Sequence, residues 1–314
     1  MSALAVLAID AGQTGVKTRL LRDGRTDDGL TLPGVRTDAP LAPQFADAVH
    51  RAAARAGAPI GVVAIGASGL VDARADADAL LALTADAGVE RVLLAHDSVT
   101  SYLGSLGDTR GAVVAAGTGV VALAVGRTRI ARIDGWGNIM GDAGSGHWIG
   151  REVLDAVMRA HDGRGAPTAL ADVVRERWPD LEAAYIDLQS DPDRVRVVAS
   201  FAERAAALAA SDETAARIVR RAADELALSA ATGLDRVRDE GDARTGFTVG
   251  VIGGVFRSDA VRERFAQTLA ERWPGAGVIV PQGTGLDGAA ALAALPSTHA
   301  LHAAITVASP VHAG

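Results

Sequence analysis

The sequence predicts an α/β protein with two lobes, in which strands of a mainly parallel sheet alternate with helices. Two observations support this fold class. Short apolar runs such as 60–65 and 91–95 alternate with segments of helical spacing such as 42–56 and 75–87. In addition, a strand, a tight glycine turn and a second strand occur at 4–21 and recur at 112–125. Two halves that open with the same hairpin predict two lobes.

The N-terminal hairpin has a carboxylate at its mouth. The apolar run 4–9 ends at Asp10, a glycine turn follows at 12–15, and the run 16–21 alternates with the period of a strand. Exposed turn amides bind phosphate well, so we predict a phosphate-binding hairpin, with an ordinary hairpin and a solvated Asp10 as the alternative. A P-loop is excluded, because no glycine directly precedes Lys17 and no helix follows the turn. Lys17, the only lysine, is expected to be a surface or structural residue.

Composition excludes several classes of function. The chain has 314 residues, no cysteine and a formal net charge of −7. Disulfides, cysteine-ligated zinc, iron–sulfur clusters and thiol nucleophiles are therefore excluded. No apolar run is long enough to span a bilayer, and the start lacks the basic region of a signal peptide. We expect a cytoplasmic protein that binds neither nucleic acid nor a membrane.

Three polar side chains in the first half directly follow predicted strands. Asp10, Ser68 and Asp97 each end an apolar run. Because the carboxyl ends of parallel strands meet at one edge of a sheet, these residues are expected to converge. The alternatives are a plain turn for Ser68 and a helix N-cap for Asp97.

The second half repeats the hairpin and continues into helices. A third short strand near 30–32 completes the first hairpin. The later segments are predicted as strands at 112–116, 120–125, 129–133, 247–252 and 278–280, a glycine-dense loop at 134–146, and helices at 147–160, within 168–238, at 258–272 and at 284–295. The two hairpins suggest lobes that hold a polyphosphate. The tail 296–314 carries three histidines, and a frayed terminus is favoured over a metal site.

Five ordered motifs resemble the N-acetylglucosamine kinases of the BadF/BadG/BcrA/BcrD ATPase family, within the actin–hexokinase–Hsp70 fold class. The resemblance runs from about 4 to 295. The motifs are Ile-Asp-Ala-Gly-Gln-Thr-Gly at 9–15, His-Asp-Ser at 96–98, Ala-Gly-Thr-Gly at 116–119, Gly-Trp-Gly through Gly-Asp-Ala-Gly-Ser at 135–145, and Gly-Gly-Val at 253–255.

The resemblance implies two ribonuclease-H-like lobes of the actin/hexokinase fold with an ATP/sugar cleft between them. The first lobe would comprise 1–108 and 285–300, and the second 109–284. Residues 301–314 would form a flexible tail. The helical stretch 168–238 would form a lobe face and a homodimer surface.

The resemblance also implies an activity, namely ATP-dependent phosphorylation of an amino sugar, N-acetylglucosamine in the first instance, at the 6-hydroxyl. Asp97 would be the general base, and Asp10 would hold Mg²⁺. The residues implied to bind ATP are Gly12, Gln13, Thr14, Gly15, Gly117, Thr118, Gly119, Gly253 and Gly254. Those implied to bind the sugar are Ser68, Asp97, Trp136, Gly137 and Asp142.

Some positions depart from the family pattern or have a second interpretation. Ala143 stands where the family usually has glutamate, and the loop 33–38 lacks the family's asparagine. The sugar is therefore left open among N-acetylglucosamine, glucosamine, N-acetylmuramic acid and glucose. A non-catalytic sugar or nucleotide sensor is the alternative function. Trp136 is expected either to stack on the sugar or to pack in the core, Asp142 either to bind the sugar or to cap the next helix, and His147 to lie on the helix surface. The absence of cysteine excludes the dehydratase activators of the family, which hold an iron–sulfur cluster.

Overall fold

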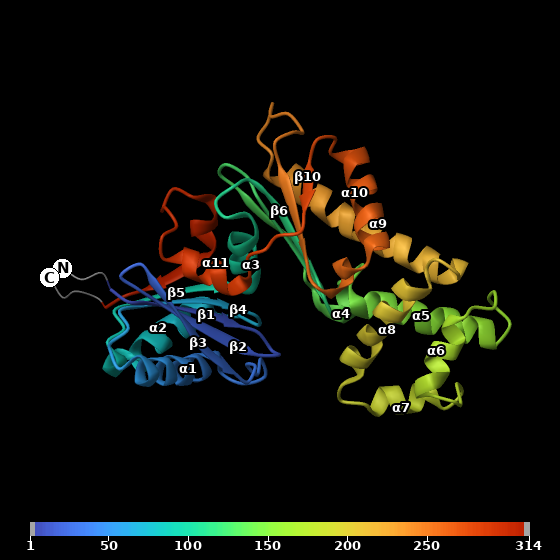
Figure 1. Cartoon of the computed structure of the whole chain (residues 1–314), viewed down its shortest axis with the longest axis horizontal. Helices are drawn as coiled ribbons and strands as arrows, with labels where there is room; N and C mark the ends of the chain where they lie inside the picture. Colours follow the sequence, from blue (N-terminus) through green and yellow to red (C-terminus); the bar gives the residue numbers. More distant parts are fainter. Residues whose placement is uncertain (1–3, 311–314) are drawn as a thin grey trace. The chain divides into compact units, whose positions relative to one another are not determined.

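The computed structural model describes residues 4–310 and has an α/β architecture with two sheets (Figure 1). The chain divides into two compact units. Among the described residues, the first unit comprises 4–109, 127–130 and 281–310, and the second comprises 110–126 and 131–280.

The first unit is a six-stranded sheet with helices on both faces. Its elements are β1 (Val6–Ala11), β2 (Val16–Arg22), β3 (Arg25–Leu32), α1 (Leu41–Ala56), β4 (Val62–Ala67), α2 (Ala73–Leu83), a 3-10 helix at Ala85–Ala87, β5 (Arg91–His96), α3 (Asp97–Leu106), α11 (Gly285–Leu292), a 3-10 helix at Ala300–Ala304, and β11 (Ile305–Ala308). The strand order is β11-β5-β4-β1-β2-β3. β1, β4 and β5 are parallel, whereas β2, β3 and β11 pair antiparallel. The sheet is thus mixed rather than mainly parallel, because β2 and β3 add antiparallel strands at one edge and β11 adds one at the other.

Alternation along β1 assigns its side chains to two different layers. Leu7 and Ile9 are buried in the core that α1 and α2 cover, whereas Ala8 packs against Leu286 and Ala289 of α11. Successive side chains of a strand point to opposite faces. Asp10 therefore lies on the same face as Ala8, where Figure 1 shows α3 and α11.

The layer formed by α3 and α11 is thin because glycines allow close packing. A Cβ added at Gly288 of α11 would lie 1.7 Å from the carbonyl oxygen of Thr100 in α3. A Cβ added at Gly66 of β4 would lie 2.0 Å from Thr100 Oγ1. Larger side chains would separate the two helices from the sheet, so these glycines bring both helix N-termini close to the end of β1.

The prediction of a flexible tail at 301–314 is wrong for most of the segment. β11 pairs antiparallel with β5 along Ile305–Ala308, and Leu301 is fully buried. Arg74 Nη1 also donates to the carbonyl oxygen of Val307 at 2.8 Å. Four residues are too short to show a strand period in the sequence, and the remaining positions 311–314 lie outside the described residues.

The second unit is a five-stranded sheet with a large helical part. Its elements are β6 (Gly111–Ala116), β7 (Val120–Val125), β8 (Ile130–Asp134), α4 (Gly137–Met140), α5 (Gly146–His161), α6 (Leu170–Arg177), α7 (Ala184–Ser190), α8 (Arg194–Leu208), α9 (Glu213–Val237), β9 (Thr248–Ile252), a 3-10 helix at Gly254–Arg257, α10 (Asp259–Arg272) and β10 (Gly277–Ile279). The strand order is β10-β9-β6-β7-β8. One continuous core joins the sheet to α5, α8, α9 and α10.

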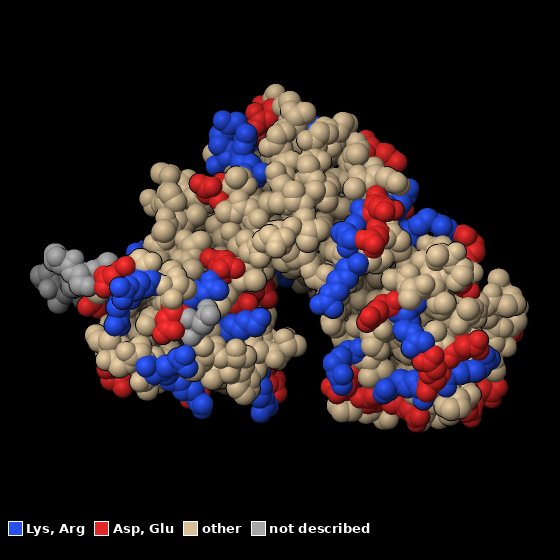
Figure 2. Space-filling view, in the orientation of Figure 1, with Lys and Arg blue, Asp and Glu red and all other residues tan. Residues whose placement is uncertain are grey.

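The surface of the helical part carries charges of both signs. Figure 2 shows acidic and basic side chains interspersed over this part of the visible face. Many of them form pairs within or between helices, such as Arg204 with Glu176 at 2.7 Å. Among residues 4–310, no helix combines the length and the hydrophobicity that a membrane crossing requires.

The start of α11 is held by a capping box that β2 reinforces. Thr284 and Asp287 cap each other, with the Thr284 N–H donating to Asp287 Oδ2 at 2.7 Å, and Arg19 donates to Asp287 Oδ1. The Thr284 hydroxyl, and then Arg19, lower the pKa of Asp287 to about 2 from a usual 3.8. A lowered pKa means that this carboxylate stabilises the folded state above pH 3.8 and that the contribution is lost as the pH falls through about 2.

We expect Asp287→Ala to reduce the free energy of unfolding at pH 7 by about 1 kcal/mol, as measured by urea denaturation. The difference from wild type should shrink as the pH falls from about 4 to about 2. Asp47→Ala, which breaks the exposed pair between Asp47 and Arg51, is the control and should change stability by less than about 0.5 kcal/mol. A pH-independent effect of Asp287→Ala would contradict the interpretation.

The two adjacent glycines after β9, Gly253 and Gly254, differ in whether the surrounding structure has room for a Cβ atom. Gly253 has φ +101°, and a Cβ there would lie 2.3 Å from the carbonyl oxygen of Ala116 at the end of β6. Nothing lies within 4 Å of a Cβ built at Gly254.

We expect Gly253→Ala to destabilise the protein by about 2 kcal/mol or more, and Gly254→Ala by less than about 1 kcal/mol. Equal urea midpoints for the two variants would refute this assignment of strain.

Candidate functional site

Two carboxylates lie close together on one face of the first sheet. Asp10 is the residue before the last in β1, and Asp97 is the first residue of α3, directly after β5. Burial and the negative charge of Asp97 raise the pKa of Asp10, while Lys17, its register partner on β2, acts in the opposite direction. The parallel register of β1, β4 and β5 puts all three residues that were predicted to converge, Asp10, Ser68 and Asp97, at neighbouring strand ends.

The residue before Asp97, and not Asp97 itself, caps α3. His96 Nδ1 accepts the Ser98 N–H at 3.2 Å and lies 2.8 Å from Asp97 Oδ1. The alternative that Asp97 is a helix N-cap is therefore wrong. Sequence reasoning missed His96 because histidine is an uncommon capping residue. Asp97 does not serve as the cap, and its carboxylate lies against the His96 ring.

Asp10 lies against the N-terminus of α11. A Cβ added at Gly285, the first residue of that helix, would lie 3.0 Å from Asp10 Oδ1. The pKa of Asp10 responds to burial and to the charges of Asp97 and Lys17. Within the described part of the chain, no hydrogen bond to the Asp10 carboxylate contributes. A half-buried carboxylate beside a second carboxylate, with its oxygens unused, matches the oxygen ligands that Mg²⁺ takes. The residues present therefore fit a magnesium ion at Asp10.

The glycine turn 12–15 connects β1 to β2 and exposes its two central residues. The Gly12 N–H donates to the Gly15 carbonyl at 3.1 Å, so this amide is used within the turn. Gln13 and Thr14 are exposed. A Cβ at Gly34 would lie 2.0 Å from the Gln13 carbonyl oxygen, so the following loop supports the turn closely. The amides and hydroxyl at the tip are the groups that remain to bind a ligand.

Ser68 lies beside this turn at the end of β4. Its N–H donates to the Ala11 carbonyl at 3.2 Å, which extends the pairing of β1 with β4 by one residue. Its Oγ is buried and has no hydrogen-bond partner among the described residues. A buried hydroxyl without a partner is unfavourable, and a polar ligand at this position would satisfy it.

The second glycine turn, 117–119, is held by the first turn of α5. The Gly146 N–H donates to the Gly117 carbonyl at 2.8 Å, and the His147 N–H donates to the Thr118 carbonyl at 3.0 Å. The Gly117 N–H is used within the turn, because it donates to the Gly119 carbonyl at 2.9 Å. Thr118 is exposed at the tip. His147 is half-buried, and burial lowers its pKa.

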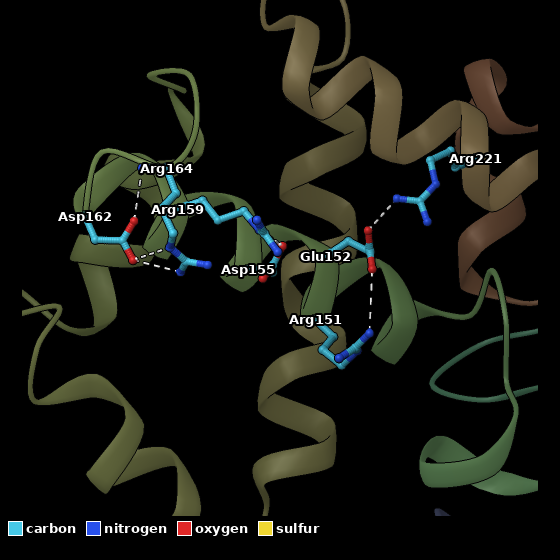
Figure 3. Close-up of polar contacts among 7 residues, drawn as sticks. All are labelled: Arg151, Glu152, Asp155, Arg159, Asp162, Arg164 and Arg221. Carbon is cyan, nitrogen blue, oxygen red and sulfur yellow. Dashed lines mark hydrogen bonds and ion pairs between the residues drawn. The ribbon is translucent and has the colours of Figure 1, made fainter.

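α5 is itself anchored to α9 by charged side chains. Glu152 lies between Arg151 and Arg221, with Arg221 Nη1 2.6 Å from Glu152 Oε2 (Figure 3). The guanidinium of Arg221 also lies 5.1 Å from the centre of the Trp148 ring. The Glu152 side chain is 18% exposed, whereas the Arg221 side chain is 54% exposed, so water still screens this pair. The turn 117–119 is therefore held by a helix that is itself joined to α9 by these contacts.

Gly253, in the last of the predicted motifs, lies beside the second glycine turn. Its close contact with Ala116 puts the segment 253–254 beside the residue that precedes the turn 117–119. Both glycines are exposed. The structure thus unites, within the second unit, the two motifs that were expected to bind ATP.

Asp142 supports the second turn from the other side. It is 7% exposed with φ +61°, and its Oδ1 accepts the Val120 N–H at 3.3 Å. A Cβ at Gly119 would lie 2.7 Å from Asp142 Oδ2. Burial raises the pKa of Asp142. The N-cap of α5 is Ser145, whose side chain accepts the Trp148 N–H, so the alternative that Asp142 caps this helix is wrong.

Trp136 is exposed on the loop that follows β8. Its side chain is 60% exposed, and the Arg132 guanidinium lies 5.2 Å from its ring centre. The alternative that Trp136 packs in the core is therefore wrong. The neighbouring Gly137 has φ +81° and opens the short helix α4. An exposed indole on a glycine-bounded segment is available to stack on a ligand.

Sequence reasoning missed Asp134, the last residue of β8. Its carboxylate accepts four backbone N–H groups of the glycine-dense loop, namely those of Gly135, Trp136, Asp142 and Ala143. The signal in the sequence was an Asp-Gly pair at the start of a loop, which is typical of a side chain that bonds to the backbone after it. That signal indicates the contacts of Asp134 with the residues directly after it. It does not indicate the contacts with Asp142 and Ala143 at the far end of the loop.

The sequence is similar to a known protein family and to two curated sugar kinases. The model of the BadF/BadG/BcrA/BcrD ATPase family matches residues 7–293. An N-acetyl-D-glucosamine kinase of Dictyostelium discoideum is 39% identical over 75 residues, 24% of each chain. An N-acetylmuramic acid/N-acetylglucosamine kinase of Clostridium acetobutylicum is 33% identical over 81 residues, 26% of each chain. The match thus spans about a quarter of the length of these curated relatives.

Solved structures share the fold over almost the whole chain. A proposed N-acetylglucosamine kinase from Chromobacterium violaceum has a TM-score of 0.69 at 24% identity, over 93% of this chain and 99% of that one. The glucose-complexed hexokinase of Schistosoma mansoni has a TM-score of 0.58 at 14% identity, over 93% and 85%. The predicted fold class, with two α/β units of the hexokinase type, is confirmed. Because the family model covers most of its length, the chain belongs to the BadF/BadG/BcrA/BcrD ATPase family.

Proposed function

We propose that this protein is an ATP-dependent kinase that transfers the γ-phosphoryl group to an amino sugar, N-acetylglucosamine in the first instance, at its 6-hydroxyl. The single observation that carries the proposal is the pair of carboxylates, Asp10 and Asp97, on the α3 and α11 face of the first sheet. Phosphoryl transfer needs a base for the attacking hydroxyl and a site for the cation that accompanies the phosphates. The two carboxylates can supply one each.

Asp97 is the proposed general base. It accepts the proton of the sugar hydroxyl as the oxygen attacks the γ-phosphorus and the bond to the β-phosphate oxygen breaks. Asp97 is the first residue of α3, at the end of the β5 strand. The His96 cap keeps the residue in this turn.

Asp10 is the proposed residue for Mg²⁺, directly or through water. When bound, Mg²⁺ neutralises negative charge on the phosphates. Asp10 meets this need with its unused oxygens and with a local excess of negative charge that a cation would relieve. The close approach of Gly285 leaves no side chain from α11 to compete for those oxygens.

The proposed phosphate contacts come from the exposed tips of the two glycine turns. In the first, Gln13 and Thr14 are available, with Gly12 and Gly15 shaping the turn. In the second, Thr118 is the exposed residue, and Gly117 and Gly119 shape the turn. Amides and hydroxyls of such turns bind phosphate without a positively charged side chain. Gly253 and Gly254 are the proposed contacts to the adenosine part.

The proposed sugar contacts are Ser68, Asp97, Trp136, Gly137 and Asp142. The unpartnered Ser68 hydroxyl and the exposed Trp136 ring support this assignment best. A site built to bond particular hydroxyls rejects sugars that lack them, so discrimination between sugars can be measured directly.

A panel of N-acetylglucosamine, glucosamine, N-acetylmuramic acid and glucose in a coupled ADP-release assay would identify the substrate. ADP release that no sugar stimulates would favour a non-catalytic sensor.

A homodimer is also proposed, through the helical stretch 168–238. Tyr185 and Ile186 of α7 are 60% and 57% exposed and form an apolar spot within this stretch. Sedimentation velocity should give twice the chain mass of 31.9 kDa. A monomer at micromolar concentration would contradict this assembly.

We expect Asp97→Asn to lower kcat by about 10²- to 10⁴-fold with little change in the KM of the sugar, because an amide cannot accept the proton. Steady-state kinetics with the best sugar of the panel tests this. Asp47→Asn, which alters an exposed carboxylate on α1, is the control and should leave kcat unchanged. Near wild-type turnover of Asp97→Asn would rule out Asp97 as the base.

A further inference from the structure

The loop 135–143 leaves β8 and returns to α5 with little support from side chains of its own. Trp136, Ile139 and Met140 are 60%, 92% and 81% exposed. Within the described residues, the loop is not anchored by a buried apolar side chain before Asp142. Its conformation therefore depends on polar contacts, which are easier to lose than core packing.

Asp134 supplies most of these polar contacts from a single side chain. Its Oδ1 accepts the Gly135 N–H at 2.7 Å and the Asp142 N–H at 2.8 Å, and its Oδ2 accepts the Ala143 N–H at 3.1 Å. A weaker contact joins Oδ1 to the Trp136 N–H at 3.4 Å. One carboxylate thus binds the first and the last residues of the loop and closes it.

The backbone around Asp134 is shaped for this task. Asp134 itself has φ +58°, a conformation that L-residues other than asparagine and aspartate rarely adopt. A Cβ at Gly141 would lie 2.4 Å from Asp134 Oδ1, so the chain passes directly over the carboxylate. Gly135 also has a positive φ, and Arg132 donates to its carbonyl oxygen. Such strain persists only where the surrounding contacts enforce it.

Three of the five residues proposed to contact the sugar lie in the loop that Asp134 holds. Trp136 and Gly137 lie inside the loop, and the Asp142 N–H is a direct partner of Asp134. We propose that Asp134 is a positioning residue for sugar recognition, which fixes the loop 135–143 by four backbone hydrogen bonds and touches no substrate itself. This inference rests on the proposed function.

The turn 117–119 does not depend on Asp134 in the same way. Asp142 links the loop to this turn, but the turn also has two contacts with the first turn of α5, through the Gly146 and His147 N–H groups, in which Asp134 takes no part. Loss of Asp134 should therefore weaken sugar recognition more than nucleotide binding. A general loss of folding would weaken both equally.

The test compares Asp134→Asn and Asp134→Ala with wild type. The asparagine amide oxygen keeps the bonds that Oδ1 makes, but its NH₂ cannot accept the Ala143 N–H, whereas alanine loses all four bonds. We expect the sugar KM to rise about tenfold or more in Asp134→Ala and by less in Asp134→Asn. The Kd of ADP, measured by calorimetry, should change by less than about threefold. Asp155→Asn, which breaks the exposed Asp155–Arg159 pair on α5, is the control and should leave both values unchanged.

Hydrogen exchange provides a readout that needs no activity. Backbone amides within 135–143 should exchange faster in both Asp134 variants, most in Asp134→Ala, while peptides from α9 stay protected. Unchanged exchange would overturn the structural part of the proposal. Faster exchange with an unchanged sugar KM, or an equal loss of ADP affinity, would overturn its functional part.

Failure of the kinase proposal would look different. Wild-type protein without sugar-stimulated ADP release would overturn the proposed function and the kinetic part of this inference together. The exchange experiment would then still decide whether Asp134 holds the loop.

Discussion

The close packing of α3 and α11 on one face of the first sheet is the constraint that determines where Asp10 and Asp97 lie. Burial, and then the negative charge of Asp97, raise the pKa of Asp10, so the ionised form of this carboxyl group is disfavoured where it lies. The fold nevertheless holds both carboxyl groups there, because glycines such as Gly288 let α3 and α11 pack tightly on that face. A stable fold that maintains an unfavourable arrangement indicates that the arrangement serves binding or catalysis.

Buried carboxylates in the two units are used in opposite ways. Asp134 of the second unit accepts four backbone N–H groups, so its charge is already compensated within the chain. Among the described residues, the Asp10 carboxylate accepts no hydrogen bond, and the negative charge of Asp97 acts on it. Asp134 therefore organises the backbone, whereas the Asp10 carboxylate is left for a ligand. Residue type alone does not separate these roles, but the number of donors around each group does.

The sequence predicted most elements correctly because their patterns are strong and local. The hairpin that carries Asp10 and the strands around the turn 117–119 were placed to within a few residues, since strand periods and glycine turns are both visible in the sequence. Contacts between distant positions were not predictable in this way. The tail strand β11 has only four residues, and its pairing with β5 is set by tertiary structure. The bonds from Asp134 to Asp142 and Ala143 depend equally on how the loop closes.

The position of Ala143 bears on the identity of the sugar. The residue contributes its backbone N–H to Asp134 at 3.1 Å, a contact that does not depend on its side chain. The loop can therefore keep its shape although alanine stands where the resembling kinases usually have glutamate. What changes is one carboxylate, which could accept hydrogen bonds from sugar hydroxyls or repel an acidic substituent. If the loop binds the sugar as proposed, the missing carboxylate would change recognition of the sugar group that meets position 143, while the backbone contacts of the loop would stay the same.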